Sequence, residues 1–554
     1  MIDQEIRKAL ARALKKAQKS GALPAFDLPD DIPVERPKQE EMGDFASPVC
    51  MQLARLARMA PVKIAEAVVA NLPSLSFISD VEIAHPGFIN FTLSDAWLTA
   101  QVEEVLRAPD TYGNSDLGAG ESVQIEYVSA NPTGPLHVGS ARNAVLGDAL
   151  ASVLDAAGYA VQREYYVNDA GSRMSVFYET LYARYARALG QDVPVPEDGY
   201  HGPYMVELAK EVVDEQGDRF LQMPREEAVA EIGALGLEKV IAQARADLEL
   251  MGIRYDEWFS EQSLYHDGQY EQIMTILREG NHLDLHDGAV WFKASELGAP
   301  KDEVLIRSNG TPGYFASDIA YHYDKFVRRG FQRVIDVWGA DHQGHVPRMK
   351  AMMRALGLDP ERLIIILYQL VTFKRGGEVV RFSKRTGDII TLREVVEEVG
   401  ADAMRYFLLS RSADSQMDFD IELAKKQSDE NPVYYIQYAH ARISSILRHA
   451  GDIDYSTGDV SLLTSAPELN LIRRMVRLPE VVRDSAAQLS PHHLTYFAYD
   501  LAAAFHGFYR DCRVVSSDPA DEAITRARLR LVSACKIVLA RALTLMGMSA
   551  PEVM

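Results

Sequence analysis

A histidine at position 137 lies in a segment whose residue types suit the binding of a phosphate group. Segment 131–140 holds two prolines and two glycines, and it separates an alternating apolar run from apolar residues at helical spacing. The start of a helix presents backbone N–H groups to an anion, and glycine lets the anion approach closely. His137 can donate a hydrogen bond to a phosphate oxygen in a transition state. An ordinary turn with an incidental histidine is the alternative.

A second segment, 378–388, places three cations around Ser383 in a glycine-bearing loop. The cations are Arg381, Lys384 and Arg385, and an amphipathic helix pattern follows them. A loop that carries Lys384 can fold over a triphosphate and neutralise the charge that develops as pyrophosphate departs. A solvated basic turn is the alternative for this segment taken alone.

Strand and helix patterns predict the scaffold that holds these two segments. Between residues 121 and 411, helical stretches alternate with apolar strand-like runs at 123–128, 161–167, 334–338 and 363–367. This alternation is typical of an α/β fold with a Rossmann-type parallel sheet covered by helices. The interval 190–310 has weaker alternation and more turns, which indicates an insertion between two halves of the fold. Neither GxGxxG after a strand nor GxxxxGK followed by Ser or Thr occurs, so a dinucleotide site and a P-loop have no support.

Two flanking regions predict further domains. Region 1–112 indicates a small α/β unit, with a helix to Lys19, a helix at 49–56 and strands at 77–83 and 88–93. A connector rich in Gly and Asp follows at 109–120 and marks a boundary. Region 412–554 is predicted to be all-α, with a loop around 451–467.

The start of the helical region mixes aromatic, amide and cationic side chains. They include Asn431, Tyr434, Gln437, Tyr438 and Arg442. A surface of this kind can stack on unpaired bases and hydrogen-bond to them. Packing within the domain is the alternative.

The composition is that of an ordinary globular protein with an acidic balance. The 554 residues are 47% hydrophobic and 25% charged, and the formal net charge is −21. At roughly 100 to 200 residues per domain, this length predicts three or more domains. Negative charge opposes a nucleic acid at long range, but local patches decide binding, and arginines at 473–477 and 526–530 form such patches. Solubility is the alternative role of these arginines.

Cysteine usage and apolar runs exclude several classes of protein. Cys50, Cys512 and Cys535 are odd in number and far apart, so neither a disulfide framework nor a zinc site is indicated, and we expect all three to be buried. No apolar run approaches the roughly 20 residues of a membrane span. The amphipathic start, 1–10, carries both charge signs, which argues against export. We therefore expect a cytoplasmic protein that does not bind membranes.

In this order, the two loops resemble the paired HIGH and KMSK motifs of class I aminoacyl-tRNA synthetases. Further segments resemble the arginyl-tRNA synthetases in particular, namely 126–137, 166–171, 314–322, 338–347, 504–514 and 546–554. The resemblance implies ATP-dependent activation of L-arginine to arginyl-AMP and transfer to the 2′-OH of the terminal adenosine of its tRNA. It also implies an N-terminal tRNA-binding domain and a C-terminal anticodon-binding domain. We expect a monomer, with magnesium arriving on ATP and no structural metal.

The resemblance assigns roles to individual residues. In catalysis it places His137, Gly139, Ser383 and Lys384. In ATP binding it places His137, Gly139, Asp341, His342 and Lys384. In arginine binding it places Glu126, Ser129, Asn131, Tyr314, Asp318 and Gln343. In tRNA binding it places Phe88, Asn90, Asn431, Tyr434, Gln437, Tyr438 and Arg442.

The arginine site has a chemical rationale. A planar guanidinium with several donors requires carboxylates and a flat or hydroxyl-bearing neighbour. Tyr314 and Asp318 are four residues apart, so a helix would project both to one side. A capping or surface carboxylate is the alternative for Asp318, and an outward-facing residue of an edge strand for Glu126.

Three departures from the family pattern leave alternatives open. Ser140 stands where a second histidine is common, Arg381 and Phe382 replace a Lys and a Met, and Arg173 replaces a glutamine. One alternative is a catalytically silent, tRNA-binding relative. Another is a class I synthetase for a different amino acid, which the Tyr314 and Asp318 pair disfavours because it suits a cationic side chain.

Overall fold

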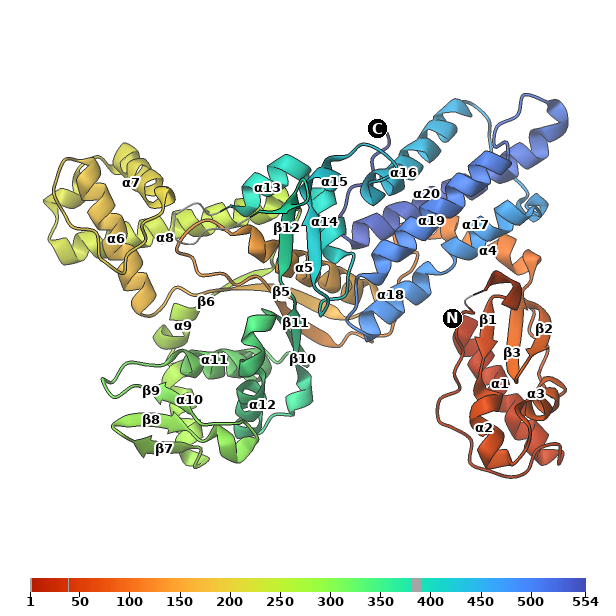
Figure 1. The fold of residues 1–554 in the computed structure, drawn as a ribbon, viewed down its shortest axis with the longest axis horizontal. Helices are drawn as coiled ribbons and strands as arrows, with labels where there is room; N and C mark the ends of the chain where they lie inside the picture. Colours follow the sequence, from red (N-terminus) through yellow and green to blue (C-terminus); the bar gives the residue numbers. More distant parts are fainter. Residues whose placement is uncertain (1, 38, 381–389) are drawn as a thin grey trace.

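The computed structural model of this chain describes residues 2–37, 39–380 and 390–554. It shows a central body, a separate N-terminal lobe and two further lobes that project from the body (Figure 1). Helices of the C-terminal part extend from the body towards the N-terminal lobe.

The body is built on a parallel sheet of five strands in the order β11-β10-β4-β5-β6. They are β4 (Ser122–Glu126), β5 (Ala160–Val167), β6 (Glu257–Ser260), β10 (Arg333–Gly339) and β11 (Leu363–Tyr368). All four strand pairings are parallel, which confirms the predicted Rossmann-type class. Ligands of such sheets bind beyond the carboxyl ends of the strands. Because β4 is the central strand, Glu126 at its end lies in the middle of that edge and not on an edge strand.

Helix α5 (Ala141–Ala156) packs closely on the centre of the sheet. A Cβ at Gly147 would lie 2.2 Å from Cγ of Tyr127, so this close approach requires a glycine. The buried amide of Asn143 accepts a hydrogen bond from the Val128 N–H (2.7 Å) and donates to the Val337 carbonyl (2.8 Å). The helix thereby fixes the carboxyl ends of β4 and β10 relative to each other.

The interval 190–310 differs from the single insertion that the sequence predicts, because β6 lies within it and belongs to the central sheet. Before β6, the helices α6 (Ser172–Ala188), α7 (Pro203–Gln216) and α8 (Arg225–Leu250) form a lobe with its own apolar core. After β6, an antiparallel sheet of β7 (Leu283–His286), β8 (Ala289–Phe292) and β9 (Glu303–Ile306) lies beside α10 (Gln269–Glu279), α11 (Tyr314–Tyr323) and α12 (Val346–Ala355) (Figure 1). Where the sequence predicts many turns, the structure has a helix of 26 residues, α8.

The N-terminal lobe combines helices α1 (Ile2–Lys19), α2 (Val49–Ala57) and α3 (Pro61–Val69) with an antiparallel sheet of β1 (Phe45–Ser47), β3 (Phe88–Leu93) and β2 (Ile78–Ala84). Ile6, Leu10 and Leu14 are buried at helical spacing on α1, so its apolar face forms the core of the lobe. Helix α4 (Asp95–Arg107), which the sequence groups with this unit, instead packs on the C-terminal helices α17 (Ala466–Met475) and α20 (Glu522–Leu545) (Figure 1).

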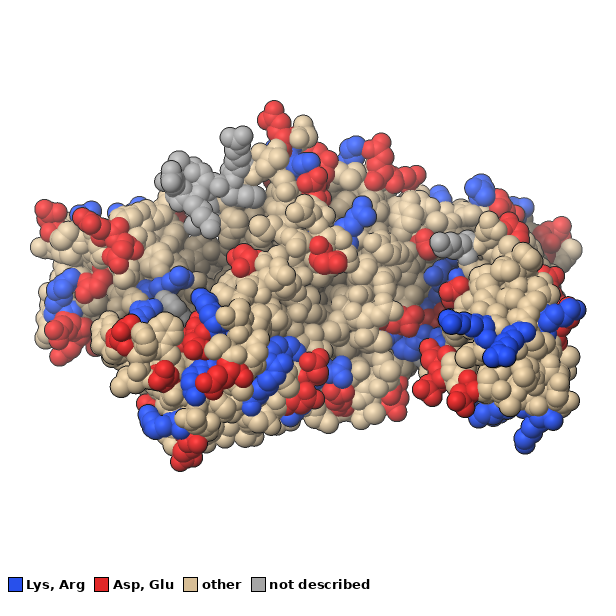
Figure 2. Space-filling model, turned by 60° about the horizontal axis from the view of Figure 1, so that its bottom comes forward, with Lys and Arg blue, Asp and Glu red and all other residues tan. Residues whose placement is uncertain are grey.

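Charged side chains of both signs are interspersed over the face of the molecule drawn in Figure 2. The N-terminal lobe, at the right of that view, stands apart from the body, and basic side chains are visible in the crevice between them. The acidic net charge therefore does not produce a uniformly acidic surface on this face.

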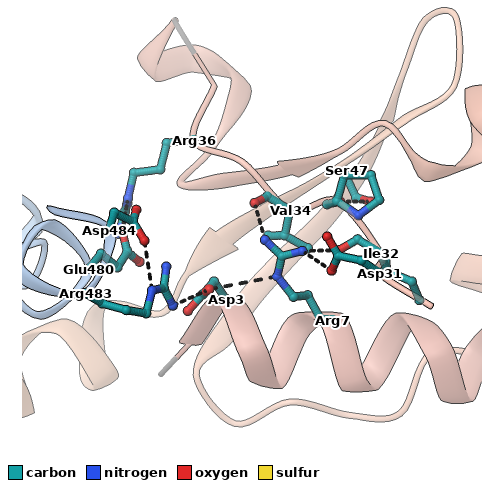
Figure 3. A network of polar contacts seen from close by, with 11 residues as sticks. Asp3, Arg7, Asp31, Ile32, Val34, Arg36, Ser47, Glu480, Arg483 and Asp484 are labelled. Carbon is teal, nitrogen blue, oxygen red and sulfur yellow. Dashed lines mark hydrogen bonds and ion pairs between the residues drawn. The ribbon is translucent and has the colours of Figure 1, made fainter. Parts of the chain in front are cut away.

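Ion pairs join the N-terminal lobe to helix α18 (Leu478–Ala487) (Figure 3). Arg36 donates to both carboxylate oxygens of Glu480 (2.8 and 3.0 Å), and Arg483 donates to Asp3 (2.7 Å). Because these contacts are charged and partly exposed, salt should weaken the junction.

The C-terminal part consists of α16 (Pro432–His449), α17 (Ala466–Met475), α18, α19 (His493–Asp511) and α20 (Glu522–Leu545). Its helical character agrees with the sequence, apart from a short strand, β14 (Met417–Asp420), that pairs with β12 (Val371–Arg375). The C-terminal part is connected to the body by buried Arg405 of α14 (Ala401–Leu409). The Arg405 guanidinium bonds to Asp148 of α5 and to the carbonyls of Met251 (2.8 Å) and Met546 (2.7 Å).

Two further expectations concern buried and apolar residues. Cys50, Cys512 and Cys535 are all free and buried, as predicted. Among the helices of the described ranges, none combines the length and the apolar character needed to cross a bilayer.

Candidate active site

A cavity of about 2210 Å³ opens at the carboxyl ends of β4, β5 and β10. It brings together most of the residues that the sequence predicts for ATP and arginine. Those that line it are Glu126, Ser129, Asn131, His137, Gly139, Asp318, Asp341 and His342. The early turn and the acidic residues thus share one site, although they are up to about 200 positions apart in the chain.

The His137 turn is held by the chain that follows the second predicted motif. Val138 donates to the Ile390 carbonyl (3.1 Å), and Leu392 donates to the Leu136 carbonyl (2.8 Å). Ser383 and Lys384 themselves lie outside the described residues, so their proximity to the cavity stays a prediction. The described residues directly after them nevertheless form a bridge with the turn, since Thr391 pairs with His137.

The chain bends sharply where it leaves β4. Val128 (φ 69°) and Ser129 (φ 43°) adopt left-handed backbone conformations, which are strained for residues other than glycine. The Ser129 hydroxyl accepts a hydrogen bond from the Tyr166 N–H (3.1 Å), and the Ala130 N–H donates to the Tyr165 hydroxyl (3.1 Å). These contacts hold the bend and keep Ser129 at the cavity wall.

Asp318 provides a carboxylate at the floor of the cavity, from the middle of α11. Burial, together with nearby Glu126, raises the pKa of Asp318 to about 6, although His322 and Arg348 oppose the shift. Among the side chains that the structure describes, none donates a hydrogen bond to this carboxylate. A cationic ligand would therefore gain a partner that the protein leaves unpaired. Tyr314 begins α11, but its side chain lies outside the description, so its pairing with Asp318 stays a prediction.

Glu126 provides a second carboxylate at the floor. Its side chain is only 12% exposed, and its Oε2 accepts a hydrogen bond from Lys325 (2.6 Å). Lys325 was not indicated by the sequence, because an isolated lysine in a helical pattern suggests a solvated face.

Residues of helix η6 (Ala340–His345) form an exposed rim of the cavity. Asp341 and His342 line the cavity, and their side chains lie 3.7 Å apart (Oδ2 to Nε2). Gln343 is exposed and is not among the lining residues, so the structure does not place it with the predicted arginine contacts.

The outer walls of the cavity come from both projecting lobes and were not predicted. Tyr200, His201 and Tyr204 line it from the segment before and at the start of α7, and His286 and Trp291 line it from the β7–β8 hairpin. The sequence offers little signal for them, because these residues lie in the turn-rich interval without a motif.

A second cavity, of about 910 Å³, lies among the C-terminal helices. The rings of Tyr434 and Tyr438 are stacked, with centroids 5.9 Å apart and planes 7° apart. The Arg442 guanidinium lies over the rings of Tyr438 (5.0 Å) and Tyr509 (4.8 Å). Tyr438, Arg442 and Tyr509 line this cavity, so they present flat surfaces on which bases can stack.

Three of the predicted tRNA contacts are buried amides that the protein itself uses. Asn431 caps α16 by accepting from the Val433 N–H (3.0 Å), and it donates to the carbonyls of Ala424 and Lys426. The Gln437 amide donates to Asp402 (2.7 Å) and to the Ser549 carbonyl (3.1 Å). Asn90 is also buried on β3, whereas its neighbour Phe88 is half-buried. The burial of these amides corrects the expectation that they are free to contact RNA.

The parallel-sheet fold and the His137 turn, which the chain at Thr391 holds in place, define the class of protein. Residues 101–418 match the family model described as tRNA synthetases class I (R), catalytic domain. Residues 4–93 match the arginyl tRNA synthetase N terminal domain, and residues 436–554 match the DALR anticodon binding domain.

The relatives specify the family within this class. The chain is 54% identical over 555 residues to the arginine–tRNA ligase of Dehalococcoides mccartyi, covering 100% of this chain and 99% of that protein. It is 47% identical over 559 residues to the arginine–tRNA ligase of Carboxydothermus hydrogenoformans, again covering 100% of this chain and 99% of the relative. The Thermus thermophilus arginyl-tRNA synthetase has the same fold, with a TM-score of 0.75 at 24% identity over the full length of both chains. The chain belongs to the arginyl-tRNA synthetase family.

Proposed function

We propose that the cavity at the carboxyl ends of β4, β5 and β10 activates L-arginine with ATP, as an arginine–tRNA ligase requires. The arginine carboxylate attacks the α-phosphate in line, a bond forms between them, and the bond to the β-phosphate breaks to release pyrophosphate. No nucleophilic side chain is needed, so the protein contributes positioning and charge stabilisation. The observation that carries this proposal is that the Asp318 carboxylate, which accepts no hydrogen bond from the described side chains, lines one cavity with the His137 turn.

Glu126 and Asp318 would receive the guanidinium, together with the hydroxyl of Tyr314. Two fixed carboxylates suit the fork of a guanidinium, whereas the point charge of a lysine ammonium cannot satisfy both at once. Ser129 and Asn131, which line the same cavity, would contact the α-amino and carboxylate groups. Gln343 is left out of this set because it does not line the cavity.

ATP would lie along the His137 turn. His137 and Gly139 would contact its phosphates, and Asp341 and His342 lie on the rim where the adenosine would extend. Ser383 and Lys384 would neutralise the departing pyrophosphate. Magnesium would enter as part of the ATP complex, held mainly by phosphate oxygens.

The second step would pass the arginyl group to the 2′-OH of the terminal adenosine of the tRNA. The matched DALR domain carries the stacked Tyr434 and Tyr438 and the adjacent Arg442, which we propose as contacts of unpaired anticodon bases. Phe88 on the N-terminal lobe remains a candidate contact for another part of the tRNA. We expect the chain to act as a monomer.

A charging assay tests the proposal. The protein is incubated with ATP, bulk tRNA and each amino acid in turn, and aminoacyl-tRNA is measured. Arginine should be the amino acid that is attached. Preferential attachment of lysine or cysteine would reject the substrate, and tight tRNA binding without charging would favour a catalytically silent relative.

A further inference from the structure

Lys325 is a wholly buried lysine directly behind the predicted arginine site. It lies on a π-helical turn, η5 (Asp324–Arg328), that continues α11 beyond Asp318. Its side chain has an exposed fraction of 0%. A π turn inserts one extra residue into a helix and is frequent at functional sites, and here it accompanies the burial of three consecutive residues, Asp324 to Phe326.

The strand register explains why a cation is needed at this place. Asp336 on β10 pairs directly with Glu126 on β4, and Glu126 pairs with Glu164 on β5. Residues paired in a parallel sheet project to the same face, so three carboxylates form a row across the centre of the sheet. Like charges directly opposite one another destabilise a sheet unless cations separate them.

Lys325 separates the first two carboxylates of this row. Its ammonium lies 2.6 Å from Oε2 of Glu126 and 3.1 Å from Oδ1 of Asp336. The ring of Tyr321 lies on a further side, 4.1 Å away. Three partners match the three N–H donors of the ammonium. Burial would lower the pKa of Lys325, but Asp336 and Glu126 outweigh burial and raise it, so the ammonium is charged.

Arg329 compensates the third carboxylate of the row. It donates to both oxygens of Glu164 (2.5 and 2.9 Å), and the Tyr321 hydroxyl donates to the same group (2.5 Å). Glu164 is fully buried and does not line the cavity, whereas Glu126 does. The two cations therefore have similar structural tasks, but only Lys325 holds a carboxylate that faces the cavity.

We propose that Lys325 is a positioning residue for arginine, which holds Glu126 in a fixed orientation at the cavity floor before the substrate arrives. This inference rests on the proposed role of Glu126 in binding the guanidinium. Because Lys325 occupies Oε2, the other oxygen of Glu126 is the one left for a donor of the guanidinium. The substrate then meets a carboxylate of fixed direction beside Asp318, which reduces the ordering that binding requires.

The charged and titratable groups around Glu126 come from several elements. They are Lys325 of η5, Asp336 of β10, Glu164 and Tyr166 of β5, Asp318 and Tyr321 of α11, and Tyr255 before β6. The His322 ring contacts Asp336 (3.0 Å), on the carboxylate oxygen that Lys325 does not bind. Without Lys325, the carboxylates of Glu126 and Asp336 would face each other with no ammonium between them, and Glu126 would lose the partner that fixes its direction. Arginine binding should therefore weaken.

The test compares KM for arginine among variants of the full chain, in a charging assay with saturating ATP and tRNA. Lys325→Met keeps the length of the side chain and removes its charge. Arg329→Met is the matched control, since it removes the neighbouring cation and its pair with Glu164. Glu126→Gln tests the proposed arginine contact itself. Thermal unfolding and KM for ATP are measured for each variant.

We expect Lys325→Met to raise KM for arginine about tenfold or more relative to the parent enzyme. KM for ATP should stay unchanged, and Arg329→Met should alter stability more than KM for arginine. A constant KM for arginine in Lys325→Met, or an equal rise in Arg329→Met, would overturn the inference. If Glu126→Gln also leaves KM for arginine unchanged, the proposed arginine site fails as well.

A double variant covers the case in which Lys325→Met does not fold. Lys325→Met with Asp336→Asn removes one cation and one carboxylate, so it leaves no facing carboxylates between β4 and β10. The inference expects a raised KM for arginine, because Glu126 still lacks the ammonium that fixes its direction. A normal KM would show that Lys325 serves only to neutralise Asp336.

Discussion

The backbone N–H of Gly139 donates a hydrogen bond to Nδ1 of His137, at a distance of 2.8 Å. An N–H group can only donate, so Nδ1 must act as the acceptor, and the neutral imidazole then carries its proton on Nε2. The turn thereby selects the tautomer whose outer nitrogen can donate to a phosphate oxygen. Gly139 is thus linked to the proposed ATP chemistry through the orientation of the histidine.

Gly139→Ala should lower kcat by disturbing this histidine. The added Cβ would lie 2.9 Å from Nδ1 of His137, so the ring must move. Loss of one oriented donor to a developing charge typically costs about 2.7 to 4 kcal/mol, or roughly 100- to 1000-fold in kcat. Steady-state charging should show this loss with KM for arginine nearly unchanged.

Two further variants separate this effect from a general disturbance. Gly344→Ala on η6 is the matched control, because an added Cβ there meets nothing within 4 Å. Since Gly139 acts through His137, the double variant Gly139→Ala with His137→Ala should be no slower than His137→Ala alone. Additive losses would contradict the proposed link.

Asp318→Asn should weaken arginine binding and leave ATP binding intact. The amide keeps the shape of the side chain but cannot pair with a guanidinium, and losing one partner of a desolvated pair costs about 2 to 4 kcal/mol. KM for arginine should therefore rise about 30- to 700-fold. Asp284→Asn, on β7 in the outer wall of the same cavity, is the control and should have a small effect. An unaltered KM in Asp318→Asn would reject the assignment.

The same substitution should stabilise the empty enzyme at neutral pH. Burial raises the pKa of Asp318 to about 6, above the value near 3.9 of an unfolded chain, so the folded state binds the proton more tightly. Ionising Asp318 therefore costs stability, and this cost grows as the pH rises from about 4 to 6 and is complete above 6. Asp318→Asn removes the cost.

Measurements of the free energy of unfolding from pH 4 to pH 8 check that Asp318→Asn stabilises the protein. Asp318→Asn should be more stable than the parent by about 1 to 3 kcal/mol at pH 8, with a smaller gain at pH 4. Arginine should reduce the difference at pH 8, because the guanidinium binds the ionised carboxylate of the parent. A gain that is independent of pH would indicate a packing effect instead.

Four of the five strands of the central sheet could be predicted from the sequence because each contains an apolar run. The apolar runs at 123–128, 161–167, 334–338 and 363–367 coincide with β4, β5, β10 and β11 to within about two residues. Strand β6 carries no such run, since it has only four residues and is partly exposed. Its sequence therefore has the same character as the turns around it.

The buried polar contacts could not be predicted, because the two residues of each contact are distant in the chain. Lys325 pairs with Glu126 across 199 positions, and Gln437 pairs with Ser549 across 112. A charged or amide residue taken alone is most often exposed, so nothing local reveals that such a residue is buried. The two predicted phosphate-binding loops were recognisable because their residue types follow from phosphate chemistry, which is local.

Tyr438→Ala should weaken tRNA binding without affecting the small substrates. Tyr438 stacks on Tyr434 and supports Arg442, and all three belong to the helix that begins the predicted tRNA surface. Stacking of a base on an aromatic ring contributes about 1 to 3 kcal/mol, so KM for tRNA should rise roughly 5- to 150-fold. KM for arginine and for ATP should not change, because the proposed site of these substrates is the other cavity. Tyr496→Ala is the control, since Tyr496 is an exposed tyrosine on α19 that does not line the cavity among the C-terminal helices. Equal effects of the two tyrosine variants would place the bases elsewhere on the helical domain.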